Sequence, residues 1–291
     1  MSKYTGDDEQ ETEDQEELQG QMSFLDHLEE LRNRLIRMLI AIGVAFGVCW
    51  WQAGKISRII QIPIAEAMTG QKIAVMDELR QVWAVIRYNV SPLANSTIQL
   101  NMLKPTDGFN LAMKVAFLGG IFLASPFIIY QIWGFISPGL YKRERRYALP
   151  FVFFSSVLFF IGGLFGYFVA FPYAMKFLLH FGLDDLGMKA TISGLEYFDQ
   201  FIAIELCLGI VFLLPALIFL LSRFGIVSGS FLLRNTKYAI LLIFVIAAVI
   251  TPTPDIPDMM VVAVPMLVLY LLGVVVAYLF GKRRKTEEAE A

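Results

Sequence analysis

Two short stretches of the chain each place a carboxylate among basic and apolar residues. The first covers residues 27–34 and contains Glu30, and the second covers residues 135–146 and contains Glu144. Both stretches lie beside a long hydrophobic run. A carboxylate in a partly apolar cleft can bind the guanidinium group of an arginine through two parallel hydrogen bonds. Together the stretches predict a surface that receives a charged, partly apolar peptide.

Local pairing is the alternative for both carboxylates. Glu30 can form an ion pair with Arg34 one helical turn later, on an amphipathic lead-in to the first hydrophobic run. Glu144 has four basic neighbours, and exposed pairs of this kind contribute only about 0–1 kcal/mol to stability. The residue pattern leaves both alternatives open.

A third carboxylate, Glu205, lies inside a hydrophobic run, roughly 10 Å along the expected helix. An ionisable group at this depth is costly, so it indicates a function that involves a buried partner. The alternative is a neutral or hydrogen-bonded glutamate without a functional role.

The composition predicts an all-α integral membrane protein. The 291 residues are 57% hydrophobic and only 17% charged, and their long apolar runs are typical of membrane helices. Helices are the expected state because an open sheet edge in lipid would leave backbone groups unpaired. Six runs qualify as transmembrane helices, at residues 35–53, 109–135, 147–171, 198–221, 238–250 and 259–280.

The placement of basic residues predicts the orientation of these spans. Lys and Arg gather before the first run, between the second and third, between the fourth and fifth, and after the sixth. Such residues accumulate on the cytoplasmic side. We therefore expect both termini, and both carboxylate-bearing stretches, to face the cytoplasm.

The chain divides into three regions. Residues 1–20 hold eight carboxylates against the single Lys3, so we expect a disordered acidic cytoplasmic tail over residues 1–21. Residues 22–281 form the six-helix membrane domain, with a long outer loop at about 55–107. Residues 282–291 form a cytoplasmic C-terminal tail.

The fifth span is short, and prolines lie within the second, fourth and sixth spans. Residues 237–250 rise only about 21 Å, against a hydrocarbon core of about 30 Å. Such a span must thin the bilayer or lie against its neighbours, and both alternatives remain open. Pro126, Pro215 and Pro265 each remove a backbone hydrogen bond within a span. We expect bent helices that form a concave body.

Nothing in the sequence indicates an enzyme. The chain has no nucleophile–base pair, no glycine-rich phosphate loop and no cluster of metal ligands. The two cysteines, Cys49 and Cys207, lie in apolar runs and are expected to pack as small core residues. We expect no cofactor, no bound metal and no nucleic-acid partner.

Several motifs resemble those of one family, over about residues 22–285. They are His27-Leu28-x-Glu30-Leu31-Arg32-x-Arg34, Ser125-Pro126, Tyr130-Gln131-x-Trp133-x-Phe135-Ile136-x-Pro138-x-Leu140-Tyr141-x-x-Glu144-Arg145-Arg146, the turn Thr251-Pro252-Thr253-Pro254-Asp255, and Pro265. The family is TatC, the polytopic subunit of the twin-arginine protein translocase.

The resemblance implies a receptor for signal peptides that carry paired arginines. Such a receptor lies in the cytoplasmic (inner) membrane, works with single-span TatA- or TatB-type subunits, self-associates, and exports folded proteins on the proton-motive force. By resemblance, the residues that bind the signal peptide are Glu30, Glu144, Leu31, Arg32, Arg34, Phe135 and Leu140. Those implied in partner contact or assembly are Pro63, Phe109 and Asp255, to which we add Glu205 and Met259 as hypotheses.

Two positions depart from the family pattern. Family members often carry a glutamate where this chain has Leu213, and a glutamine where it has Met259. Glu205 lies eight residues before Leu213, and we hypothesise that it substitutes for the missing acid. The main alternative function is a proton-coupled secondary transporter that uses Glu205. A passive membrane scaffold is a third interpretation.

Overall fold

The computed structural model describes residues 24–64, 75–88, 100–136, 148–180, 192–223, 225, 227–251 and 256–280. Glu144, Leu140 and Asp255 lie outside these residues.

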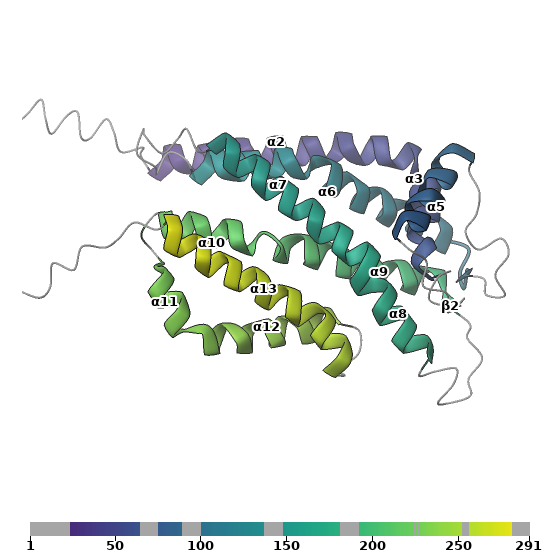
Figure 1. The fold of residues 1–291 in the computed structure, drawn as a ribbon. Coiled ribbons are helices and arrows are strands. Elements are labelled where there is room, and N and C mark those ends of the chain that lie inside the picture. Colours follow the sequence, from purple (N-terminus) through teal and green to yellow (C-terminus); the bar gives the residue numbers. More distant parts are fainter. Residues whose placement is uncertain are drawn as a thin grey trace, which may run out of the picture.

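The described chain is mostly helical (Figure 1). Its elements are α2 (Phe24–Trp51), α3 (Ala53–Ile60), α5 (Val75–Tyr88), β1 (Leu100–Asn101), α6 (Asp107–Ile136), α7 (Ala148–Phe165), η3 (Gly166–Ala170), α8 (Phe171–His180), β2 (Ile192–Ser193), α9 (Gly194–Val211), α10 (Leu214–Arg223), α11 (Gly229–Arg234), α12 (Thr236–Ile250) and α13 (Ile256–Phe280).

Five helical stretches are long and apolar enough to cross a membrane, and each lies at a predicted span. They are His27–Trp51, Asp107–Phe135, Pro150–Leu179, Gly194–Arg223 and Met259–Leu279. The helical membrane class is therefore confirmed. The predicted span at 238–250 corresponds to α12, whose 15 residues form a shorter apolar helix. That α12 crosses the membrane stays a prediction.

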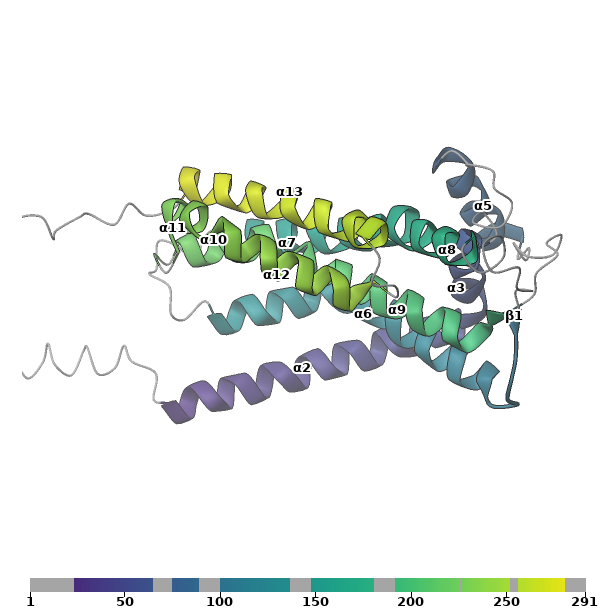
Figure 2. The same ribbon diagram turned by 90° about the horizontal axis from the view of Figure 1, so that it is seen from below.

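The long helices run side by side, and the connecting elements gather at one end. α2 packs along α6, α10 packs along α13, and α9 lies against both α6 and α7. The start of α2 and the end of α13 lie at one end of the bundle, which we call the terminal end (Figures 1 and 2). α3, α5 and both strands lie at the opposite end, which we call the distal end.

The third span is longer than predicted and contains one π-helical turn. Its predicted end was Phe171, but the helix continues through η3 into α8 and ends at His180. A π turn inserts an extra residue into an α-helix, and such turns are frequent at functional sites. No local residue pattern signals the turn, because the sequence stays apolar through it.

Prolines act differently in the second and fourth spans. α6 continues through Pro126, where the hydroxyl of Ser125 donates to the carbonyl of Phe122 at 2.8 Å. That carbonyl is the one that an N–H at position 126 would otherwise reach. The fourth span is instead interrupted, since α9 ends at Val211 and α10 begins one residue before Pro215. The predicted single helix at 198–221 is thus two helices.

Hydrogen bonds from two tyrosines, the half-buried Tyr167 and the buried Tyr197, connect the distal end to the bundle. The hydroxyls of Tyr167 and Tyr197 donate to the consecutive carbonyls of Ile59 and Ile60, each at 2.7 Å. These carbonyls lie at the end of α3, where the helix leaves acceptors unpaired. β1 and β2 add a two-residue parallel pairing between Leu100–Asn101 and Ile192–Ser193. The segment after the first span is therefore held in place by hydrogen bonds to distant helices.

We predict that Tyr197→Phe destabilises the fold. The phenyl ring keeps the packing of this 2%-exposed side chain but leaves the Ile60 carbonyl without the tyrosine hydroxyl. A buried acceptor that loses its donor costs about 1–3 kcal/mol. Thermal unfolding in detergent measures the effect, with Tyr173→Phe as a control because Tyr173 is 46% exposed. Equal unfolding temperatures for the two variants would contradict this assignment.

Candidate functional site

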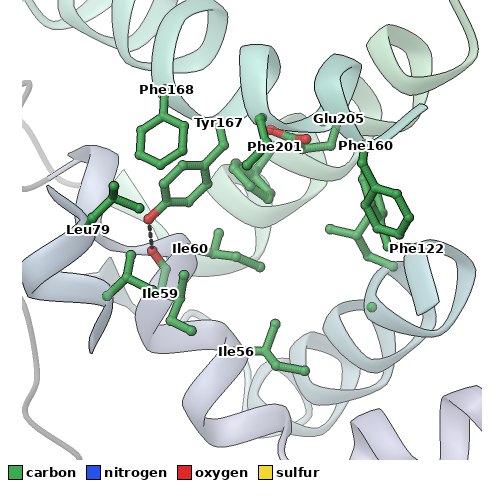
Figure 3. Close-up of a pocket in the computed structure, with 15 residues that line it drawn as sticks. Ile56, Ile59, Ile60, Leu79, Phe122, Phe160, Tyr167, Phe168, Phe201 and Glu205 are labelled. Carbon is green, nitrogen blue, oxygen red and sulfur yellow. Dashed lines mark hydrogen bonds between the residues drawn. The ribbon is translucent and has the colours of Figure 1, made fainter. Parts of the chain in front are cut away.

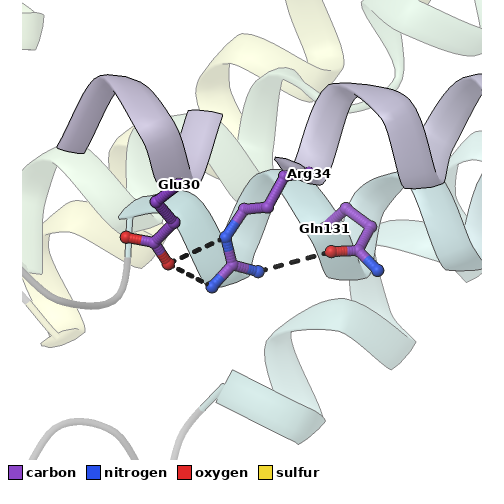
Figure 4. A network of polar contacts seen from close by, with 3 residues as sticks. All are labelled: Glu30, Arg34 and Gln131. Carbon is purple, nitrogen blue, oxygen red and sulfur yellow. Dashed lines mark hydrogen bonds and ion pairs between the residues drawn. The ribbon is translucent and has the colours of Figure 1, made fainter. Parts of the chain in front are cut away.

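A polar cluster joins α2 to α6 near the terminal end (Figure 4). Arg34 donates to Oε1 of Glu30 from Nε at 2.9 Å and from Nη2 at 2.5 Å. Its Nη1 donates to Oε1 of Gln131 on α6 at 3.4 Å. The side chains of Arg34 and Glu30 are only 19% and 20% exposed. The predicted local pairing of Glu30 with Arg34 is therefore present.

Local geometry explains how the arginine reaches α6. Glu30 and Arg34 lie four residues apart, so they share one face of α2. Opposite them, a Cβ at Gly134 would collide with Nη1 of Arg34. The glycine thus provides the space that the guanidinium occupies.

One oxygen of the Glu30 carboxylate has no partner among the residues that the structure describes. Both donors from Arg34 reach Oε1, whereas Oε2 is buried and makes no hydrogen bond in the structure described. A buried charged oxygen without a donor is unfavourable. Glu30 therefore keeps the capacity to accept a further charged donor without losing Arg34.

Three other predicted binding residues are described by the structure, namely Phe135, Leu31 and Arg32. Phe135 stacks on His27 with ring centroids 4.4 Å apart, which adds an aromatic surface at the same end of α2 and α6. Leu31 is 40% exposed. Arg32 lies elsewhere on α2, where it forms an exposed ion pair with Glu29 at 3.7 Å. The structure thus brings Arg34, and not Arg32, to Glu30.

Glu205 forms part of a second site, a largely apolar groove nearer the distal end (Figure 3). The groove has a volume of about 350 Å³ and lies between α3, α5, α6, α7, η3 and α9. Glu205 is 3% exposed, and its Oε1 makes no hydrogen bond in the described part of the chain. Figure 3 shows it among aromatic rings that include Phe201, Phe160 and Phe122.

A glycine of the third span makes room for this carboxyl group. A Cβ at Gly166 would lie 2.7 Å from Oε1 of Glu205, whereas one at Gly163 would collide with the ring of Phe122. Gly166 is also the first residue of the π turn η3. Glu205 of α9 and the π turn of the third span therefore meet at the same point.

Glu205 and Leu213 line different cavities. Leu213 lies in the interruption between α9 and α10, beside a cavity of about 280 Å³ that also contacts Trp133 and Ser155. Glu205 is not among the residues that line that cavity. The structure therefore gives no support to the hypothesis that Glu205 substitutes for an acid at position 213.

The remaining predicted positions fall near the distal end or α13. Pro63 is fully buried just after α3, which indicates a packing role. Phe109 is 60% exposed and meets Trp50 edge-on, with ring centroids 5.6 Å apart. Met259 is half-buried near the start of α13. None of the three contacts Glu30 or Glu205 in the contacts described.

The residue pattern does not identify the residues that complete both sites. Gln131 lies within the motif Tyr130–Arg146, but nothing in its spacing marks it as a site residue. Gly134, Gly163 and Gly166 were also missed, although small residues at spacings of three or four are a known signal for close helix packing in membranes. Their exact role depends on which helices meet, which the sequence alone does not give.

Comparison with known proteins decides the family. A sequence model of the family "Sec-independent protein translocase protein (TatC)" matches residues 26–265. The chain belongs to the TatC family. It is 46% identical over 281 residues to the TatC of Koribacter versatilis, covering 95% of this chain and 94% of the relative. It is 33% identical to TatCy of Bacillus subtilis, covering 93% and 95% of the two chains.

A solved structure agrees with the sequence comparison. The crystal structure of the twin-arginine translocase receptor TatC aligns with a TM-score of 0.68 at 30% identity, covering 86% of this chain and 97% of that one. The predicted resemblance to TatC is confirmed. This TatC-family chain is a multi-span membrane component of a Sec-independent protein translocase. That membership favours the translocase over a secondary transporter.

We predict opposite effects of alanine at two helical glycines. Gly166→Ala should lower the unfolding temperature, because the methyl group meets Glu205 and overpacking costs roughly 1–3 kcal/mol. Gly43→Ala should not lower it, because a methyl group added at Gly43 would have no neighbouring atom within 4 Å and alanine favours a helix by roughly 0.5–1 kcal/mol. Differential scanning fluorimetry in detergent distinguishes the two, and a stabilised Gly166→Ala variant would contradict the close packing at Glu205.

Proposed function

We propose that this protein is the translocase subunit that binds twin-arginine signal peptides at the terminal end of its helices. The observation that carries the proposal is that only one oxygen of the Glu30 carboxylate has a donor among the described residues. Oε1 accepts from Arg34, and the buried Oε2 has no partner there. A peptide guanidinium is a planar donor that fits such an oxygen. The relative solved by crystallography is itself described as a translocase receptor.

The proposed binding mode uses two carboxylates and an apolar surface. Glu30 accepts one peptide arginine, and Glu144 accepts the other. Leu31, Phe135 and Leu140 contact the apolar part of the peptide. A hydrogen bond to a charged group contributes about 1.5–3 kcal/mol, so two pairs supply roughly 3–6 kcal/mol before ordering costs. Binding of this strength discriminates between peptides and still permits release.

In this proposal, Arg34 stabilises the Glu30 carboxylate before a peptide binds. It supplies positive charge beside Glu30 and bonds to Gln131, so the carboxylate is neutralised before a peptide arrives. A lone buried carboxylate would be strongly unfavourable. The peptide guanidinium then adds to this cluster through Oε2.

The test compares two neighbouring glutamates of α2. Glu30→Gln should weaken the binding of a twin-arginine peptide by about tenfold, which corresponds to roughly 1.4 kcal/mol. Glu29→Gln should leave binding nearly unchanged, because Glu29 is 65% exposed and pairs only with Arg32 at 3.7 Å in the contacts described. Fluorescence anisotropy of a labelled peptide with the purified protein in detergent measures both.

Glu144→Ala provides a second arm of this test. This variant should lower the affinity for the twin-arginine peptide at least as much as Glu30→Gln. Replacing the peptide arginines by lysine should also lower the affinity, because lysine lacks the planar, forked guanidinium group. Unchanged affinity in both Glu30→Gln and Glu144→Ala would refute the pairing and would favour a passive scaffold.

The proposal includes the arrangement in the membrane. All six apolar runs cross the cytoplasmic (inner) membrane, with the acidic tail over residues 1–21 and the C-terminus in the cytoplasm. The bent spans form a concave body, and export of folded proteins uses the proton-motive force. The basic residues near the span ends support this orientation.

Single-span TatA- or TatB-type subunits are the partners that we propose for the groove at Glu205, within a larger self-associated complex. The groove is apolar apart from this carboxyl group, and Oε1 has no hydrogen-bond partner in the described residues. A membrane helix with one donor group would cover the apolar wall and satisfy the oxygen. An ionisable residue inside the membrane usually has a function and a specific partner.

We predict that Glu205→Leu weakens the capture of these subunits severalfold while the protein itself stays folded. Leucine suits the apolar wall but removes the acceptor. Glu196→Leu on the same helix is the control, because Glu196 is exposed at the start of α9. Quantitative co-purification from membranes measures both variants, and equal recovery of the single-span subunits would remove Glu205 from the contact.

A further inference from the structure

An ion pair outside both sites joins α6 to α9 near the distal end. Nζ of Lys114 on α6 donates to Oδ1 of Asp199 on α9 at 2.5 Å. The two side chains remain accessible, at 41% and 47% exposed. An ammonium group carries three N–H donors and a carboxylate has two oxygens, so this contact leaves hydrogen-bonding capacity on both groups. The ion pair can therefore bind a further anionic group and a further cationic group at once.

The same ion pair lines a cavity of about 380 Å³ between α2, α6 and α9. The rest of the lining is apolar and consists of Phe46 on α2, Met113 and Phe117 on α6, and Ile202 on α9. Met113 and Phe117 are 40% and 48% exposed, so the cavity opens on the surface of the helix bundle. A ligand can therefore enter it from the membrane side.

The lengths of the spans place the ion pair near the boundary of the hydrocarbon. α6 and the span Gly194–Arg223 each have 30 residues, or about 45 Å, against a hydrocarbon core of about 30 Å. With the excess shared between both ends, each span enters the hydrocarbon about 7–8 Å from its start. Lys114 lies about 10 Å from the start of α6, and Asp199 about 7–8 Å from the start of α9. Lipid headgroups lie just outside this level, and a lysine side chain can extend toward them.

The apolar part of the cavity lies deeper in the membrane than the ion pair. α6 and α9 both start at the distal end, after β1 and β2, and run toward the terminal end (Figure 2). Phe117 and Ile202 each follow a charged residue by three positions, so they lie about one turn closer to the membrane centre. The cavity is thus charged at the headgroup level and apolar below it, which matches the polarity of a phospholipid.

The two charges select among phospholipids. Lys114 can donate to a lipid phosphate, and Asp199 can accept from a primary ammonium group on the same headgroup, both as charge-assisted hydrogen bonds. A quaternary ammonium group has no N–H to donate to Asp199. An anionic headgroup without an ammonium group would place its negative charge beside the Asp199 carboxylate. A headgroup that carries both a phosphate and a primary ammonium group therefore fits best.

We propose that the cavity between α2, α6 and α9 binds a phospholipid of the distal leaflet with an ammonium-and-phosphate headgroup. Lys114 holds the phosphate, Asp199 holds the ammonium group, and an acyl chain lies against Phe117 and Ile202. The bound lipid fills the space between the first, second and fourth spans. This site does not depend on signal-peptide binding or on the groove at Glu205.

The test measures which lipid the purified full chain retains. The protein is incubated in detergent with an equimolar mixture of phosphatidylethanolamine, phosphatidylcholine and phosphatidylglycerol that share the same acyl chains, and native mass spectrometry counts the bound lipids. Phosphatidylethanolamine should be retained severalfold more than either of the others. The double variant Lys114→Leu with Asp199→Leu should lose this preference, because leucine keeps apolar packing between α6 and α9 but removes both headgroup contacts.

A charge-matched control uses two exposed residues near the same end of the bundle. Lys104→Leu with Glu196→Leu removes one base and one acid without touching the cavity lining. This control should keep the preference for phosphatidylethanolamine. The milder pair Lys114→Gln with Asp199→Asn covers the case in which the leucine variant fails to fold, and it should also lower the preference severalfold.

Three results would overturn the proposal. Equal retention of the three lipids by the native chain would mean that the ion pair does not read the headgroup. A preference that survives in both Lys114 and Asp199 variants would place the lipid elsewhere. Retention of none of the three would leave the cavity to a protein partner.

Discussion

The ion pair between Glu30 and Arg34 sets the chemistry of the terminal end. A carboxylate on an apolar scaffold is tolerated only where its charge is matched and its oxygens have donors. Arg34 matches the charge but uses one oxygen, and Gly134 and Gln131 let its guanidinium reach α6. In the described part of the chain, the result is a neutralised site whose second oxygen can still accept a hydrogen bond, which suits the arginine binding that we propose.

Glu205 poses the same physical problem at a different depth. No arginine neutralises it in the contacts described, and Gly166 only makes room for it. Glu30 is therefore suited to a charged ligand from water, whereas Glu205 is suited to a donor that arrives inside the membrane. The two carboxylates divide between peptide binding and subunit contact in the function that we propose.

The sequence predicts the long spans and one of the two ion-pair partners at the terminal end. The apolar runs predict the positions of the five long spans, and the i,i+4 spacing predicts the pairing of Glu30 with Arg34. The π turn at Gly166–Ala170 and the break before Pro215 were not predicted. Nor was the role of Gly134, because it depends on a side chain 100 positions earlier. Such features depend on which helices pack against each other, so the local sequence pattern does not predict them.

A double-mutant cycle between the protein and its ligand tests the central claim most directly. Affinities are measured for the native chain and Glu30→Gln, each with a twin-arginine peptide and with peptides in which one arginine is replaced by glutamine. If Glu30 contacts an arginine, one of these pairs should show a coupling energy of about 0.5–3 kcal/mol. Strictly additive losses for both peptide arginines would contradict the direct contact.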